Sequence, residues 1–142
     1  MSDDNTWSGG CMCGKVRFPA KGPALWVGMC HCSSCRRATG GALVAAVGFP
    51  RTAVTFIGKG PSTYASSPGV LRSFCSKCGT SIAYQSSSWP KDTHLMSGAL
   101  DDPSVLEPEF HIFAEERLPW LRLSEELPRF KTTPSAGNLV SE

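Results

Sequence analysis

Short runs that alternate between apolar and polar residues, or are apolar throughout, recur along this chain between turn residues. Lys15-Val16-Arg17-Phe18 and residues 70–74 alternate, as half-buried strands do. Residues 42–49 are almost entirely apolar and predict a buried central strand that Pro50 ends. Further strands are predicted at residues 24–29, 54–57, 63–65, 81–85, 94–98 and 109–113. The pattern predicts a protein built mainly of short β-strands.

Helical signals are confined to a few short turns. Ser33 or Ser34 is expected to cap a turn through residues 35–39, which Gly40 and Gly41 end. Asp102-Pro103 predicts a second turn, because proline fits the first helical position. These turns connect strands and do not change the predicted fold class.

The length of 142 residues fits one domain that is large enough to bury a core. Residues 1–8 are polar and acidic and are expected to form a flexible N-terminus, and residues 9–130 a single zinc-binding domain. Residues 131–142 are small and polar, with little to bury, which predicts a mobile C-terminal tail.

Charge and hydropathy exclude several classes of partner. The formal net charge is +2, and basic residues adjoin only briefly, as at Arg36-Arg37, so no nucleic-acid partner is expected. No signal peptide is visible, and no run approaches the roughly 20 apolar residues of a membrane span. We therefore expect a cytoplasmic protein without membrane contact. Nothing in the pattern indicates an oligomeric state.

Seven cysteines are the most informative part of the composition. In the cytoplasm, clustered cysteines bind metal or react more often than they form disulfides. An odd number cannot pair completely within one chain. The alternative is a secreted disulfide framework with one spare thiol.

Four of the cysteines form two closely spaced pairs. Cys11-x-Cys13 and Cys75-x-x-Cys78 each lie on a predicted turn between strands, like zinc knuckles. Four thiolates are a tetrahedral set that zinc favours, and such a site contributes directly to folding free energy. The spacing predicts a structural zinc site, against the alternative that either pair is merely buried.

The other three cysteines, Cys30, Cys32 and Cys35, are followed at once by Arg36 and Arg37. Three sulfurs without an obvious fourth ligand predict an open zinc site, which is typical of reactive rather than structural zinc. Three thiolates weaken the power of zinc to acidify water, so the site suits an incoming thiol. The arginines could hold a substrate carboxylate by bidentate hydrogen bonds.

Alternatives remain at this site. His31 could supply a fourth ligand, although neighbouring residues on a strand face opposite sides. His111 or His94 could do so from a distance, or could be ordinary core or rim histidines. Arg36 and Arg37 could be solvated surface residues.

The combined motifs resemble the glutathione-dependent formaldehyde-activating enzyme family, which includes centromere protein V. The matching segments, spread over residues 9–120, are C-x-C-G, C-H-C-S-x-C-R-R-x-T-G, F-C-x-x-C-G-T, G-A-L-D-D-P, F-H-I-F and L-P-W. Phe113 departs from the pattern, because the family often has tryptophan there.

This resemblance implies an all-β fold with two antiparallel sheets in a β-tent arrangement, in which the sheets meet over a zinc-binding apex. It also implies two zinc ions per chain: a structural ion at Cys11, Cys13, Cys75 and Cys78, and a catalytic ion at Cys30, Cys32 and Cys35. The namesake reaction adds glutathione to formaldehyde and gives S-hydroxymethylglutathione.

The predicted function is therefore that of a zinc-dependent carbon–sulfur lyase or synthase acting on a thiol such as glutathione and on formaldehyde or a related electrophile. Two alternatives remain: a carrier that binds a thiol or its adduct without turnover, and a zinc-stabilised scaffold module. The absence of a basic extension counts against a DNA-binding scaffold.

Overall fold

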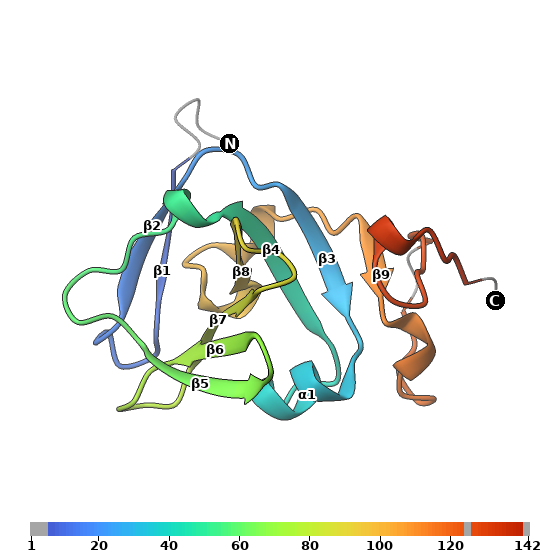
Figure 1. Cartoon of the computed structure of the whole chain (residues 1–142), viewed down its shortest axis with the longest axis horizontal. Coiled ribbons are helices and arrows are strands. Elements are labelled where there is room, and N and C mark those ends of the chain that lie inside the picture. Colours follow the sequence, from blue (N-terminus) through green and yellow to red (C-terminus); the bar gives the residue numbers. More distant parts are fainter. Residues whose placement is uncertain (1–5, 124–125, 141–142) are drawn as a thin grey trace. The chain divides into compact units, whose positions relative to one another are not determined.

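The computed structural model describes residues 6–123 and 126–140, which are mostly β with one short helix (Figure 1). The helix α1 is Ser33–Thr39. Short 3₁₀ turns lie at Arg51–Ala53, Ser97–Ala99, Pro103–Val105, Ala114–Glu116 and Pro134–Ala136. The strands are β1 (Thr6–Gly10), β2 (Arg17–Lys21), β3 (Trp26–Cys30), β4 (Val44–Pro50), β5 (Ser62–Ser67), β6 (Val70–Phe74), β7 (Ser81–Ser86), β8 (Asp92–Met96) and β9 (Phe110–Ile112).

The strands group into two sheets, and one sheet is not purely antiparallel. β1 and β2 form a two-stranded antiparallel hairpin. The larger sheet has the order β5-β6-β7-β8-β4-β3-β9, and β9 runs parallel to β3. The prediction of two antiparallel sheets is therefore wrong at this pair. Because some eighty residues separate the two strands, no hairpin turn dictates their direction.

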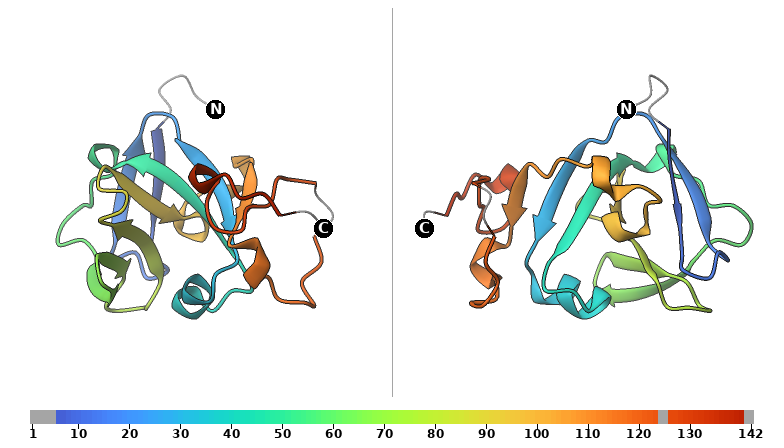
Figure 2. Two further views of the ribbon diagram at one scale, coloured as in Figure 1. Left: turned by 45° about the vertical axis from the view of Figure 1, so that its right-hand side comes forward. Right: turned by 180° about the vertical axis from the view of Figure 1, so that it is seen from behind.

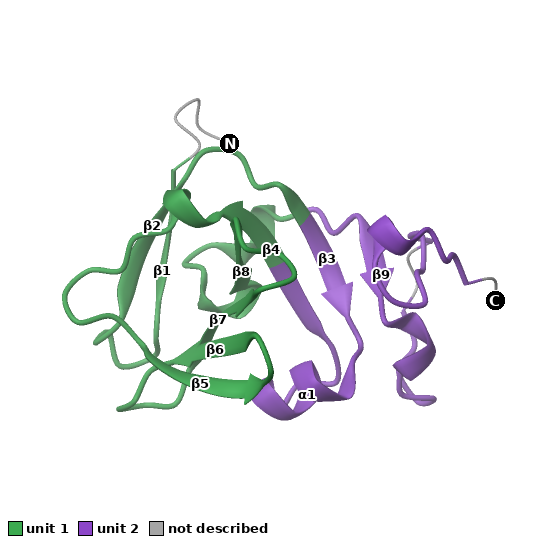
Figure 3. Ribbon diagram, viewed as in Figure 1, with its two compact units in different colours: residues 1–26, 47–106 green, residues 27–46, 107–142 purple. Residues whose placement is uncertain are grey.

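The chain divides into two compact units, residues 1–26 with 47–106 and residues 27–46 with 107–142 (Figure 3). The boundaries fall within β3 and β4. The prediction of a single domain over residues 9–130, and the tent arrangement implied by the resemblance, stay predictions.

The first unit is built around inward-facing side chains of its strands. Phe18 is 1% exposed and packs edge-on against Phe56, and the backbone of Gly9 lies so close to the Phe18 ring that no side chain would fit there. Other fully buried side chains of this unit are Val16, Val47, Phe49, Ile82 and Leu95. On the surface, Arg17 binds Asp101 with two hydrogen bonds of 2.9 and 2.6 Å.

Residues 54–57 do not form the strand that their apolar pattern predicts. They make only isolated bridges, Val54 with Ala20 and Ile57 with Arg17. The 3₁₀ turn Arg51–Ala53 follows Pro50 directly, and the Ile57 side chain is 62% exposed. Alternation indicates which side chain packs inward, as Phe56 does, but not whether the backbone completes a continuous ladder with a neighbouring strand.

Helix α1 begins at Ser33, one residue earlier than a Ser33 cap would allow and two earlier than a Ser34 cap would. Its N-cap is Cys32, whose sulfur accepts a hydrogen bond from the Cys35 N–H at 3.3 Å. The prediction of Ser33 or Ser34 as the cap is therefore wrong, because the thiol takes the position usually held by a hydroxyl. Gly40 ends the helix with φ 78°, as predicted.

Secondary structure continues beyond the bounds of the predicted domain at both ends. Residues 1–5 lie outside the described residues, but Thr6–Gly10 already forms β1. Within the predicted tail, Phe130 bridges Leu139 and the 3₁₀ turn Pro134–Ala136 intervenes. The mobility of residues 131–142 stays a prediction. Across the described ranges 6–123 and 126–140, a helix with the length and apolarity of a membrane span is absent.

His94 on β8 is enclosed by aromatic rings of the first unit. Its ring meets Trp26 edge-on at 4.6 Å between centroids and stacks on Tyr84 at 5.3 Å. Burial lowers the pKa of His94 to about 4, although Asp92, 3.8 Å away, opposes the change. His94 is therefore neutral near pH 7.

The lowered pKa of His94 predicts that the free energy of unfolding decreases on mild acidification. Since the unfolded histidine titrates near 6.5 and the folded one near 4, the unfolded chain binds more protons between these values. The His94 contribution is full above pH 6.5, and about 1 kcal/mol is lost between pH 7.5 and 5.5. Urea unfolding at both pH values should show this loss in the wild type and not in His94→Gln. Equal pH dependence in the two proteins would contradict the assignment.

Candidate metal centres

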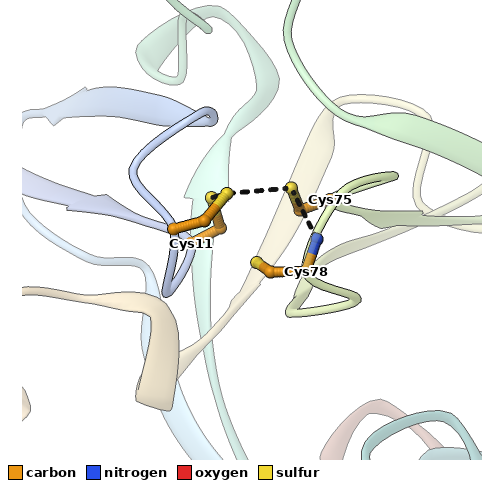
Figure 4. A group of neighbouring side chains, drawn as sticks. Cys11, Cys75 and Cys78 are labelled. Carbon is orange, nitrogen blue, oxygen red and sulfur yellow. Dashed lines mark hydrogen bonds between the residues drawn. The ribbon is translucent and has the colours of Figure 1, made fainter.

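The four predicted structural cysteines converge in the first unit (Figure 4). Cys11 and Cys13 lie on the turn between β1 and β2, and Cys75 and Cys78 on the turn between β6 and β7. All four sulfurs lie within 4.8 Å of one another. Cys13 Sγ is 3.6 Å from Cys11 Sγ and 3.8 Å from Cys75 Sγ. A tetrahedral zinc with bonds of about 2.3 Å needs sulfurs about 3.8 Å apart, so this donor set fits the ion.

Both turns have the backbone form that brings two sulfurs together. The Cys11 N–H donates to Val16 and the Cys75 N–H to Thr80, which closes each turn at 3.0 Å. Gly14 and Gly79 have φ near 80°, a conformation that side-chain-bearing residues rarely adopt. The glycines of C-x-C-G and C-x-x-C-G are therefore required by the turns.

N–H and O–H groups lie within hydrogen-bond distance of several sulfurs of this group. The Val16 N–H donates to Cys11 Sγ at 3.2 Å, and the Lys77 N–H approaches Cys75 Sγ at 3.4 Å. The Thr80 hydroxyl lies 3.2 Å from Cys78 Sγ and also accepts from the Met12 N–H. Hydrogen bonds from Thr80, side chain first and then backbone, lower the pKa of Cys78 to about 5. The sequence analysis missed this threonine, although it is part of the F-C-x-x-C-G-T segment.

The remaining three cysteines converge in the second unit. Cys30 ends β3, Cys32 caps α1 and Cys35 lies in its first turn, and their sulfurs form one group. In both views of Figure 2, α1 follows the end of β3. Cys30 is 4% exposed, whereas Cys32 and Cys35 are half-buried. Hydrogen bonds with Cys32 and Cys35, followed by burial, raise the pKa of the Cys30 thiol.

Each cysteine group could therefore bind a metal such as zinc. The group of three leaves one tetrahedral position for a ligand outside it.

The three histidines do not join this group among the described residues. His31 and His111 instead hydrogen bond to each other, with 2.8 Å between Nε2 and Nδ1. His94 belongs to the aromatic cluster of the first unit. The alternative of a Cys₃His site therefore gains no support from the geometry.

The two arginines differ in their surroundings. Arg36 is half-buried, and its Nε is buried without a hydrogen-bond partner among the described residues. Arg37 is exposed. Both lie in the last turn of α1, which also begins at the thiol group.

Phe113, the departure from the family pattern, is also unusual in its backbone. It has φ 52° and is the one non-glycine residue with positive φ in the described ranges. It lies at the junction of β9 and the turn Ala114–Glu116.

A mostly β fold with one four-cysteine and one three-cysteine group defines a protein with two candidate metal centres. Residues 6–116 match the family model of the glutathione-dependent formaldehyde-activating enzyme, and the chain belongs to this family. The resemblance found in the sequence is thereby confirmed.

Two known proteins are similar to this chain. A Halomonas elongata protein named "Putative glutathione-dependent formaldehyde-activating enzyme" is 30% identical over 125 residues, which are 81% of this chain and 79% of that protein. A crystal structure of a Rhodobacter sphaeroides protein has a TM-score of 0.57 and 22% identity, covering 71% of this chain and 91% of that one. The latter similarity shows the fold alone.

The two cysteine groups predict two zinc ions, of which the ion at the four-cysteine group contributes more to the stability of the fold. Cys75→Ser should unfold the protein and release both ions, because metal binding at a structural site contributes about 10 kcal/mol to folding. Cys30→Ser should leave one ion per chain and keep the fold. Zinc analysis and circular dichroism check both expectations. Loss of fold in Cys30→Ser would mean that the three-thiol site is structural.

Proposed function

We propose that this protein is a zinc-dependent carbon–sulfur lyase or synthase that acts on a thiol, glutathione, and on formaldehyde or a related small electrophile. Membership of the family supports the reaction class. The observation that carries the proposal is the three-thiol group, with two half-buried sulfurs and no fourth ligand among the described residues. Cys11, Cys13, Cys75 and Cys78 then hold a structural zinc.

When bound at Cys30, Cys32 and Cys35, zinc supplies a Lewis acid that favours the thiolate form of a substrate thiol or polarises the aldehyde oxygen. Cys32 and Cys35 are half-buried whereas Cys30 is 4% exposed, so we infer that a substrate reaches the group past Cys32 and Cys35. In the synthetic direction, the sulfur of the substrate bonds to the aldehyde carbon and the thiol proton ends on the aldehyde oxygen. The lyase direction reverses both changes.

Arg36 and Arg37 are proposed to bind a carboxylate of the substrate. A buried guanidinium nitrogen without a partner, as at Arg36, gains most from an incoming anion, because burial without a hydrogen bond is costly. A guanidinium also matches a carboxylate in geometry. Exposed Arg37 contributes mainly through its charge, which solvent screens.

The proposed activity can be measured by exchange spectroscopy of formaldehyde and glutathione. The zinc-loaded protein should accelerate exchange above the uncatalysed rate, and Cys32→Ser should abolish the acceleration. Arg36→Gln should raise KM about 10-fold, because the substrate carboxylate loses one charge-assisted hydrogen bond. Arg37→Gln should have a smaller effect of the same sign.

Arg117→Gln is the matched control, since Arg117 is also an exposed arginine of the second unit. Its kinetics should equal those of the wild type. If the doubly loaded protein gives no acceleration, the proposed turnover is wrong. Glutathione binding that Cys32→Ser abolishes would then identify a carrier.

A further inference from the structure

One short segment, residues 111–116, hydrogen bonds to the residues on both sides of Cys32. His31 precedes this cysteine and Ser33 follows it, and each hydrogen bonds to the segment. All of these residues belong to the second unit (Figure 3). The segment is more than seventy residues away in sequence, so these contacts fix the cysteine from outside its own motif.

The first contact is the histidine pair. His31 and His111 are 0% and 1% exposed, and their rings are tilted by 31°. A separation of 2.8 Å between Nε2 and Nδ1 requires one ring to donate its N–H and the other to accept. A buried bond of this kind orients both rings and is costly to break, because neither nitrogen can turn to water.

The backbone of His31 is held by the same strand. Its N–H donates to the Ile112 carbonyl at 3.1 Å, next to the register pair Cys30 and Ile112. The residue between the two thiols is therefore held at its backbone and at its side chain by neighbouring residues of β9.

The second contact lies on the other side of Cys32. Ser33 is the first residue of α1, and its N–H donates to Glu116 Oε1 at 3.1 Å. The first N–H groups of a helix have no partner within the helix, and a carboxylate is favoured there. Glu116 thus fixes where the helix that carries Cys35 begins.

Residues 111–116 are themselves anchored on their far side. The His111 N–H donates to Pro128 and the Phe130 N–H to His111, at 2.8 and 2.9 Å. The Phe113 N–H donates to Thr132 at 2.9 Å. The segment is thus bonded both to the thiol loop and to residues 128–132.

We propose that His111, acting through His31, and Glu116 are positioning residues of the three-thiol metal site. Neither is a ligand, since among the described residues the metal-ligating group there holds the three cysteines alone. Thiolates that lie this close repel one another, and the two contacts keep Cys32 at its place between Cys30 and Cys35. Partners that orient ligands in this way typically change metal affinity 10- to 100-fold. The inference rests on the proposed function only in that these cysteines bind zinc.

The test follows zinc release from the full-length, doubly loaded protein after addition of a chelator. Cys30→Ser identifies the release phase of the three-thiol site. His111→Leu and Glu116→Ala should each accelerate that phase about 10-fold or more, and leave the phase of the four-thiol site unchanged. His111→Gln and Glu116→Gln, which keep a hydrogen-bonding group, should restore most of the wild-type rate. These conservative variants also decide the matter if His111→Leu does not fold.

Phe110→Leu is the control for a general loosening of β9. Phe110 is next to His111, and its ring packs edge-on against Phe130. Its release phases should match the wild type. The inference is overturned if both phases accelerate together in His111→Leu, or if neither changes in folded variants. A wild type that holds only one zinc overturns the proposed function and this inference with it, whereas two zincs with unchanged release overturn the inference alone.

Discussion

Close approach of thiolates is the constraint on which this structure depends. Four sulfurs of the first unit and three of the second each lie within 4.8 Å of one another. Charged sulfurs at such distances repel strongly unless a cation lies between them. Cys11 and Cys75 are almost fully buried, which increases the cost of leaving their charge uncompensated. As thiolates, both groups could thus hold a cation for electrostatic as well as for geometric reasons.

The local spacing of the cysteines was enough to predict both groups. Two ligands on one turn need only a glycine at the correct place, and Gly14 and Gly79 provide it. The split into four and three also followed from spacing, because Cys30, Cys32 and Cys35 lie too close in sequence to be divided. Similarly, the strands at residues 70–74 and 81–86 follow from local alternation and a tight turn.

Features that depend on distant residues could not be predicted in this way. The parallel pairing of β9 with β3, the bond between His31 and His111, and the role of Glu116 each join residues about eighty apart. Nothing in the local pattern distinguishes Glu116 from Glu115 beside it. The strand predicted at residues 54–57 failed for the same reason, since a continuous ladder would depend on pairing with β2, more than thirty residues away, and only isolated bridges form. The cysteine cap of α1 was missed because propensity favours hydroxyl side chains, whereas here the ligand itself accepts the N–H.

The two cysteine groups have the same type of ligand, a thiol, so ligand type does not explain why they should have different roles. They differ in which residues hold the cysteines in position. Each half of the four-thiol group is a turn closed by its own backbone bonds, and Thr80, which contacts Cys78 and accepts from the Met12 N–H, links the two halves. A metal at this site would strengthen a junction between two turns that are already formed. The three-thiol group lies at the end of one strand and the start of one short helix, and its shape is set by side chains of residues 111–116. Hydrogen bonds from residues outside the cysteine motif can keep the three sulfurs in place while the fourth coordination position stays open. The proposed zinc site needs this open position to bind a substrate thiol.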